Sequence, residues 1–273
     1  MRLYIRAPNH LGDGVMAMPA IEAATALGEV VVAAPPWGAE LYRALDVEVV
    51  ERGTVPDADV ALLLAPSFRA AWEARRVPRR VGVRWDMRGP LLTDVVEMDG
   101  LHRSLEYRRL VEVLGGVVEA HPRFAPTAEE RAACVAPEGH VALIPCSPSG
   151  AVVQWPGFAE LAAAVPEAVV YVGPKEAFAG GVCLGLGELA AALERARVVV
   201  VNDSGLSHFA RAVGVRTLVI HGSTSPERTG AVGSVPIEGP ELPCRPCYEK
   251  SCTAGGVPCL DIPVEVVLAA IHP

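Results

Sequence analysis

The chain has 273 residues, of which 51% are hydrophobic but only 5% aromatic, and its formal net charge is −8 at pH 7. This length suits two domains, and a core of Ala, Val and Leu is typical of parallel sheets covered by helices. The negative charge argues against a general nucleic-acid binder, which needs an excess of cations. We find neither an apolar run long enough to cross a bilayer nor a secretory signal at the start, so we expect a cytoplasmic protein.

In the first half of the chain, β-branched runs alternate with Ala-rich and Leu-rich stretches, which predicts βαβ units and a parallel sheet. The expected strands are 3–7, 29–34, 47–50 and 59–65, and the expected helices are 14–27 and 101–114, with short helices after the turn 35–38 and before Pro78. Residues 115–138 break the pattern with Gly and Pro and hold one short helix, opened by Thr127 and Glu130 as a capping box. We therefore expect domains 1–136 and 137–273.

The same rhythm resumes in the second half of the chain. The expected strands are 140–145, 168–172, 197–201 and 215–221, and the expected helices are 155–164, 187–195, 205–213 and 263–271. The sequence thus predicts an α/β protein with two Rossmann-like domains, and two domains imply a cleft.

Gly12-Asp13-Gly14 follows the first expected strand and opens a helix. Ligands of open α/β sheets bind beyond the carboxyl ends of the strands, so we expect Asp13 where a substrate would lie. A carboxylate there could act as a general base toward an attacking hydroxyl. The alternative is an Asp that is favoured only by the helix dipole.

The expected strand 197–201 leads directly into Asn202-Asp203-Ser204-Gly205-Leu206-Ser207-His208 and a helix. Such a junction presents backbone N–H groups and the positive helix end, which suit a pyrophosphate. We expect Gly205 to allow close approach, His208 to donate to an oxygen and Asp203 to accept from sugar hydroxyls. The alternative is plain helix capping by Asn202 or Asp203.

Two further loops follow expected strands. Ser149 lies in 145–150, where small hydroxyl residues and Gly suit contact with phosphate or ribose. Lys175 and Glu176 lie in 173–176, where Glu176 could bind ribose hydroxyls. An ordinary turn suits the first loop equally well, and a surface turn is the simpler account of the second.

Cys244, Cys247, Cys252 and Cys259 gather within one loop near the C-terminus. Four thiolates could hold a structural zinc ion, although their spacing fits no standard finger. Disulfides and free thiols are the other hypotheses, and the sequence does not choose among the three. We expect none of them to take part in catalysis.

Composition is uneven in two respects. Seven arginines lie between positions 69 and 88 against only Glu73 and Asp86, which is either a basic patch or an ordinary solvated helix face and loop. Asn and Gln are scarce, which suggests a thermophile, although a GC-rich genome explains the bias equally well.

Taken together and in this order, these segments resemble the ADP-heptose:lipopolysaccharide heptosyltransferase family, especially its second-heptose branch. The matching stretches are residues 8–19, Trp155-Pro156, residues 202–208, residues 222–230 and the cysteine loop. Each stretch alone is weakly specific, but together they are spread over nearly the whole chain.

The resemblance implies a GT-B fold, with parallel sheets facing across a cleft, an acceptor-binding first domain and a second domain that binds an ADP-sugar. It implies an inverting transfer of heptose or a related sugar, without metal or cofactor, and Asp13 matches the general base. The donor-binding motif matches Asp203, Ser204, Gly205 and His208, while Glu176 is similar to a ribose-binding acid. The acceptor would be a lipopolysaccharide core or other anionic glycolipid at the inner membrane face. From charge alone, we expect the arginines of 69–88 to face it.

The chain departs from the family at one position, because the family commonly has Lys two residues before the Trp-Pro pair and this chain has Val153. A cation that neutralises the leaving diphosphate lowers the barrier to transfer. Lys175, Arg228, His208 and the helix dipole could compensate. The alternative is a catalytically impaired nucleotide-sugar binding protein on the same scaffold, and a weaker one is another GT-B enzyme such as a sugar-nucleotide epimerase.

Overall fold

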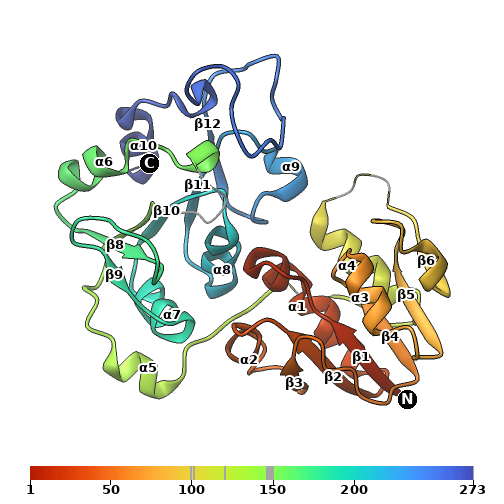
Figure 1. Ribbon diagram of the computed structural model, residues 1–273. Helices are drawn as coiled ribbons and strands as arrows, with labels where there is room; N and C mark the ends of the chain where they lie inside the picture. The colour runs from red at the N-terminus through yellow and green to blue at the C-terminus, as the bar shows by residue number, and fades with distance from the viewer. Residues whose placement is uncertain (99, 101, 120, 146–150, 273) are drawn as a thin grey trace. The chain divides into compact units, whose positions relative to one another are not determined.

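The structure is a computed structural model that describes residues 1–98, 100, 102–119, 121–145 and 151–272. The chain forms two compact units, Met1–Pro122 and Arg123–Pro273. Each unit contains one six-stranded parallel sheet flanked by helices (Figure 1). The predicted α/β class with two Rossmann-like units is confirmed.

The first unit has the strand order β3-β2-β1-β4-β5-β6. Its strands are β1 (Arg2–Arg6), β2 (Glu29–Ala34), β3 (Glu48–Glu51), β4 (Val60–Leu63), β5 (Arg79–Val83) and β6 (Asp94–Val96). Its helices are α1 (Leu11–Thr25), α2 (Gly38–Leu41), α3 (Phe68–Glu73) and α4 (Arg103–Glu112), with a 3-10 turn at Gly89–Leu91. Strand addition reverses between β1 and β4, and ligands of such sheets bind at this switch point.

The second unit repeats this topology in the order β9-β8-β7-β10-β11-β12, with its switch point between β7 and β10. Its strands are β7 (Val141–Ile144), β8 (Ala168–Val172), β9 (Val182–Cys183), β10 (Val198–Asn202), β11 (Thr217–His221) and β12 (Val235–Glu238). Its helices are α5 (Ala128–Ala133), α6 (Phe158–Ala164), α7 (Leu186–Glu194), α8 (Gly205–Val213), α9 (Pro226–Thr229) and α10 (Val264–Ile271), with 3-10 turns at Ala151–Val153 and Pro258–Leu260.

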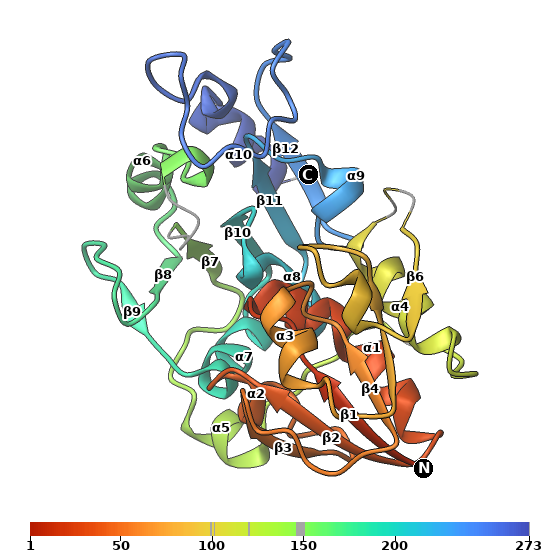
Figure 2. The ribbon, with the colours of Figure 1, turned by 45° about the vertical axis from the view of Figure 1, so that its right-hand side comes forward.

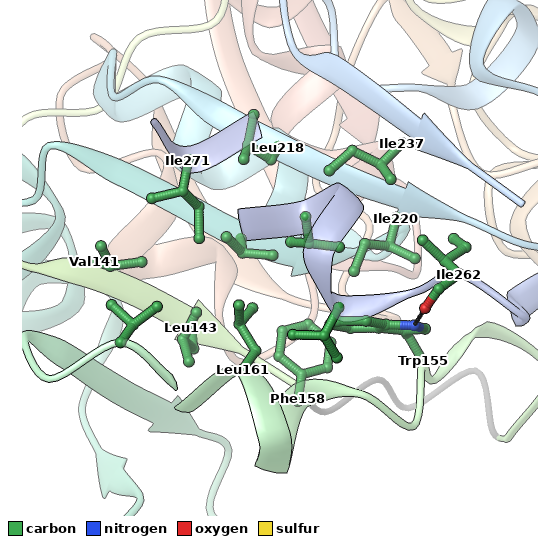
Figure 3. Close-up of a cluster of buried hydrophobic side chains, with 14 of the residues drawn as sticks. Val141, Leu143, Trp155, Phe158, Leu161, Leu218, Ile220, Ile237, Ile262 and Ile271 are labelled. Atoms are coloured by element: carbon green, nitrogen blue, oxygen red, sulfur yellow. Dashed lines mark hydrogen bonds between the residues drawn. The ribbon is translucent and has the colours of Figure 1, made fainter. Parts of the chain in front are cut away.

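Both faces of each sheet are covered. In the first unit α1 and α4 lie side by side (Figures 1 and 2). Ala71 of α3, and Ala74 directly after this helix, join a separate core cluster with Tyr4. In the second unit α6 and α10 pack on Leu143 and Leu218 (Figure 3), and α8 contacts β10 and β11 without joining that cluster. Side chains of a strand point alternately to the two faces, so strands buried on both sides become continuous apolar runs.

The boundary between the units falls before residue 123, whereas the sequence suggested 136/137. The difference arises because α5 packs on α7 of the second unit. Arg131 of α5 donates two hydrogen bonds to the Glu194 carboxylate, at 2.7 and 2.8 Å. The Gly-rich and Pro-rich stretch therefore ends the first unit, and the capping-box helix opens the second.

Four strands, β5, β6, β9 and β12, have no counterpart in the sequence-based prediction. All four lie in the outer half or at the edge of their sheet, where strands are short and tolerate charge and Pro. β5 begins with Arg79 and Arg80, and β12 contains Pro236, so neither has an apolar pattern. Within the described part of the chain, no helix is both long and apolar enough to cross a bilayer.

Candidate functional site

The carboxyl edge of the second sheet carries the loops that follow β8, β10 and β11, three strands that flank the switch point. Residues 173–176, 202–208 and 222–228 therefore share one edge around the switch point. The predicted donor residue Ser149 follows β7 in the sequence but lies outside the described residues.

Asn202 is fully buried at the end of β10 and joins two other segments. Its Oδ1 accepts from the Trp155 backbone N–H at 3.0 Å, and its Nδ2 donates to the Pro145 carbonyl. The N-cap of α8 is Ser204, and it makes no side-chain cap hydrogen bond. The alternative of helix capping by Asn202 or Asp203 is therefore wrong, and Asn202 is a structural residue.

Asp203 is a buried acid at the switch point, with a side chain that is 8% exposed. Burial raises the pKa of Asp203 to about 6, and this effect outweighs a hydrogen bond with Thr224 that lowers the pKa. The nearest ring is His221 on β11, whose Nδ1 lies 3.7 Å from Asp203 Oδ2. Burial, reinforced by Arg245 and His208, lowers the pKa of His221 to about 4. His221 is thus neutral at neutral pH, and the contact is not an ion pair there.

The junction after Asp203 places the predicted donor residues on the first turn of α8. The helix begins at Gly205, and His208 is buried one turn further on. Ser204 Oγ is shielded from solvent and has no hydrogen-bond partner among the described residues. An acid with a raised pKa beside a helix N-terminus without a side-chain cap is typical of a ligand site, because structural acids are normally paired.

Lys175 and Glu176 occupy the loop after β8. Lys175 is exposed, while Glu176 Oε2 accepts a hydrogen bond from the Gly173 backbone N–H at 2.8 Å. The Glu176 carboxylate thus accepts from the backbone of its own turn. This contact is what the alternative interpretation of 173–176 as an ordinary surface turn predicts. A role in binding ribose remains a prediction.

Trp155 and Val153 are both buried beside the site, 3% and 5% exposed. Trp155 Nε1 donates to the Ile262 carbonyl at 3.0 Å, and its ring packs on Phe158 (Figure 3). The sequence placed a helix start at Trp155, but α6 begins only at Phe158, because Trp155 is anchored in the core. Val153 likewise presents a buried apolar side chain where the related family commonly has Lys.

A pocket of about 630 Å³ lies between the start of α6 and residues 254–265. Its walls include Trp155, Glu160 and Leu260, but none of the predicted donor residues that lie within the described part of the chain. We therefore assign the pocket no role in donor binding.

Asp13 lies in the first turn of α1, at the carboxyl edge of the first sheet. The helix begins at Leu11 rather than at 14, because the Gly14 N–H already donates to the His10 carbonyl at 2.9 Å. Tyr107 Oη donates to Asp13 Oδ1 at 2.9 Å, and Arg103 Nε lies 3.4 Å from the same oxygen. The Asp13 side chain remains 22% exposed. The carboxylate is therefore oriented by two donors of α4 and still reaches solvent, as a general base must.

The sequence analysis missed Arg103 and Tyr107. Burial first, and then the charge of Asp13, raises the pKa of Tyr107 well above its ordinary value, so the hydroxyl stays a donor. The two residues are four apart on a helix and thus share one face, which was the available signal. Their partner could not be read from the sequence, because it depends on how α4 packs on α1.

The arginines of 69–88 do not form one basic face, so that hypothesis is corrected. Arg88 is fully buried and donates to the carbonyls of Val83 and Ala65. Arg79 pairs with Asp94 at 2.8 Å, and Arg80 donates to the Leu91 carbonyl at 2.6 Å. These side chains tie β5 to its neighbours, and the exposed arginines are those of α3, its C-terminal end and the turn after β5.

Cys244, Cys247, Cys252 and Cys259 are free thiols in the structure. Arg245 anchors their loop by donating to the Gly222 carbonyl at 2.9 Å and to Glu238 at 2.8 Å. Among the described residues, no group of three or more His, Cys, Asp or Glu is arranged to hold a metal ion.

Comparison with known proteins connects this site with one family. The family model of glycosyltransferase family 9 (heptosyltransferase) matches residues 181–257, which contain β10 and α8. Over 71 residues the chain is 44% identical to lipopolysaccharide heptosyltransferase 1 of Pseudomonas aeruginosa, a match that covers 26% of this chain and 20% of that relative.

Solved structures extend the likeness in fold to the whole chain. The structure of E. coli ADP-heptose LPS heptosyltransferase II matches with a TM-score of 0.77 and 20% identity, covering 99% of this chain and 98% of that one. E. coli heptosyltransferase WaaC with ADP matches with a TM-score of 0.70 and 16% identity, covering 99% and 97%. The two sheets thus have the architecture of GT-B glycosyltransferases. The match over residues 181–257 confirms the resemblance to the heptosyltransferase family.

Proposed function

We propose that this protein is an inverting glycosyltransferase that moves heptose, or a related sugar, from an ADP-sugar to a hydroxyl of a cell-surface glycan. One observation carries the proposal. The segment that matches the heptosyltransferase family model, 181–257, contains the strand-to-helix junction of residues 203–208, and this junction lies at the switch point of a Rossmann-like sheet.

The second unit binds the donor in this proposal. The diphosphate meets the N-terminus of α8 at Gly205, where backbone N–H groups and the helix dipole favour negative charge. His208 donates to a phosphate oxygen, and Asp203 accepts from sugar hydroxyls. The fold relative WaaC, whose structure holds ADP, supports an adenosine diphosphate as the leaving group. Ser149, Lys175 and Glu176 complete the proposed donor site.

Asp13 acts as the general base. As the acceptor oxygen forms its bond to the anomeric carbon, its proton passes to Asp13 and the bond from that carbon to the diphosphate oxygen breaks. Attack opposite the leaving group inverts the anomeric centre. Tyr107 and Arg103 hold Asp13 Oδ1, which leaves Oδ2 for the acceptor hydroxyl. Positive charge of the protein, rather than a metal ion, neutralises the ADP that leaves.

The acceptor in this proposal is a lipopolysaccharide core or another anionic glycolipid, and the protein works in the cytoplasm at the inner membrane face. The likeness to lipopolysaccharide heptosyltransferase 1 over 71 residues supports this substrate class. A thermophilic source stays a prediction from composition.

Transfer of heptose from ADP-heptose to extracted lipopolysaccharide cores, followed by mass spectrometry, tests the proposal. We expect a product one heptose heavier, unchanged yield with EDTA, and a kcat roughly a hundredfold lower for Asp13→Asn with unchanged affinity for ADP. ADP-heptose binding without transfer to any core would favour the impaired binding protein. An epimerised sugar nucleotide formed without acceptor would favour the epimerase.

A further inference from the structure

Four large apolar side chains of the first unit are exposed on two joined segments, α3 and the turn after β5. They are Phe68 at 43%, Trp72 at 50%, Trp85 at 67% and Met87 at 90%, and we call them the aromatic patch. The rings of Phe68 and Trp72 stack on α3 with centroids 6.2 Å apart. The turn that carries Trp85 and Met87 is joined to α3, because Asp86 Oδ2 accepts from the Phe68 N–H at 2.9 Å. Large apolar side chains that are exposed on two joined segments point to an interaction site.

The fold holds this turn in a conformation that exposes it. Asp86 and Met87 both have left-handed backbones, with φ of 51° and 55°, which side chains other than Gly rarely adopt. The next residue, Arg88, anchors the turn from inside by donating to the carbonyls of Val83 and Ala65. A Cβ on Gly82 would lie 3.1 Å from the Arg88 guanidinium, so Gly82 leaves room for it. A strained turn that the surrounding structure maintains, with Trp and Met at its tip, is more than an incidental loop.

Arginines surround the aromatic patch. The Arg75 guanidinium lies 4.4 Å above the Trp72 ring, and Arg76 is exposed beside it. Among the described residues, neither of these two arginines takes part in an ion pair, whereas Arg69 pairs with Glu73 and Arg84 with Glu97. Arg69, Arg75, Arg76 and Arg84 stand against Glu73, Asp86 and Glu97, so cations exceed acids around the patch by four to three, although the chain as a whole carries −8. Exposed aromatic and apolar side chains can insert among lipid headgroups, and neighbouring arginines can bind the phosphates of an anionic bilayer.

We propose that the aromatic patch docks the protein on the surface of an anionic lipid bilayer, with Trp85 and Met87 inserted among the headgroups and Arg75 and Arg76 facing lipid phosphates. Docking requires neither the sugar donor nor Asp13, so it can be tested apart from the transfer reaction.

The test is co-sedimentation of the full chain with vesicles of phosphatidylglycerol or of phosphatidylcholine. We expect binding to phosphatidylglycerol that weakens with salt, and little binding to phosphatidylcholine. The double variant Trp85→Ser/Met87→Ser should bind roughly tenfold less, because it removes the inserted apolar surface. Arg75→Gln/Arg76→Gln should weaken binding and flatten its salt dependence.

The matched control is Val117→Ser/Val135→Ser, which also removes two exposed apolar side chains, 69% and 95% exposed, from other positions. It should bind vesicles like the wild type. If the double variant of the patch melts at a lower temperature, Met87→Ser alone, at a side chain 90% exposed, provides the comparison. Absence of binding to phosphatidylglycerol, or equal binding by the patch variants, would overturn the proposal. So would sedimentation-velocity evidence that the patch instead joins two copies of the chain.

Discussion

Asp13 and Asp203 are both acids at strand-to-helix junctions, but their surroundings differ. Asp13 accepts from Tyr107 and Arg103 and stays 22% exposed, which suits a carboxylate that must take a proton. The Asp203 side chain is only 8% exposed and lies beside a neutral His221. Such an acid is already shielded from water before it contacts a ligand. The sequence predicted a role for both positions from their place after a strand, and that role stays a prediction. The sequence could not distinguish their environments, because these depend on side chains from other elements.

The Tyr107 hydroxyl should contribute to turnover through Asp13. Tyr107→Phe removes one donor to the carboxylate, and we expect kcat to fall about tenfold while the affinity for ADP stays unchanged. The matched control is Tyr42→Phe, since the Tyr42 hydroxyl is also buried nearby but donates to the Gly14 carbonyl at 3.3 Å. Equal losses of kcat in the two variants would show that Tyr107 is only a packing residue.

Asp203 and His221 should affect stability in opposite directions between about pH 4 and 6.5. The raised pKa of Asp203 means that the folded state binds its proton more tightly, so acidification through about 6 stabilises the fold. The lowered pKa of His221 means that the unfolded state takes up its proton first, so acidification below 6.5 destabilises the fold. Each contribution approaches about 3 kcal/mol at its limit.

Thermal melts of single variants separate these two effects. Between pH 7 and pH 4.5, the melting temperature of Asp203→Asn should fall further than that of the wild type. In this variant the destabilising protonation of His221 is no longer offset by the stabilising protonation of Asp203. The melting temperature of His221→Gln should fall less, or rise. Parallel curves for all three proteins would contradict the assigned pKa directions.

At the scale of elements, the sequence predicted the central strands well and the outer ones poorly. The run 198–201 is a strand because four valines are buried on both faces, and its pattern needs no partner to be recognised. In β5, Arg79 pairs with Asp94 and Arg80 donates to the Leu91 carbonyl. These partners come close only in the folded sheet, so the sequence pattern does not reveal the strand. The strand-to-helix junction after β10 was predictable for the same reason as β10 itself, whereas the contacts of α4 with Asp13 were not.

Asn202 should be essential for the junction between β10 and the loop before α6. Asn202→Ala leaves the Trp155 N–H and the Pro145 carbonyl buried without their partner, and we expect a loss of about 2 to 4 kcal/mol in the free energy of unfolding. Thr25→Ala, in the last turn of α1, removes an exposed side-chain hydrogen bond to the Glu22 carbonyl and should change stability by less than about 1 kcal/mol. Urea unfolding measures both, and equal midpoints would contradict the structural role.

At the scale of the whole molecule, each unit has its own sheet, core and switch point. The second unit includes α5, which the sequence assigned to the first domain because the Gly and Pro residues around it resemble a linker. A fragment 123–273 should therefore unfold at a higher temperature than a fragment 137–273. The shorter fragment lacks Arg131, the partner of Glu194, and exposes the surface of α7 that α5 covers. Equal melting temperatures by circular dichroism would place α5 outside the folding unit.

The central claim is that residues 203–208 bind the diphosphate of an ADP-sugar. Isothermal titration of the full chain with ADP-heptose, ADP, UDP and GDP, repeated for His208→Ala and for the control Asp13→Asn, tests it most directly. We predict selective binding of ADP and ADP-heptose that is roughly tenfold weaker in His208→Ala and unchanged in Asp13→Asn. Absence of nucleotide binding by the wild type, or equal binding by His208→Ala, would contradict the account.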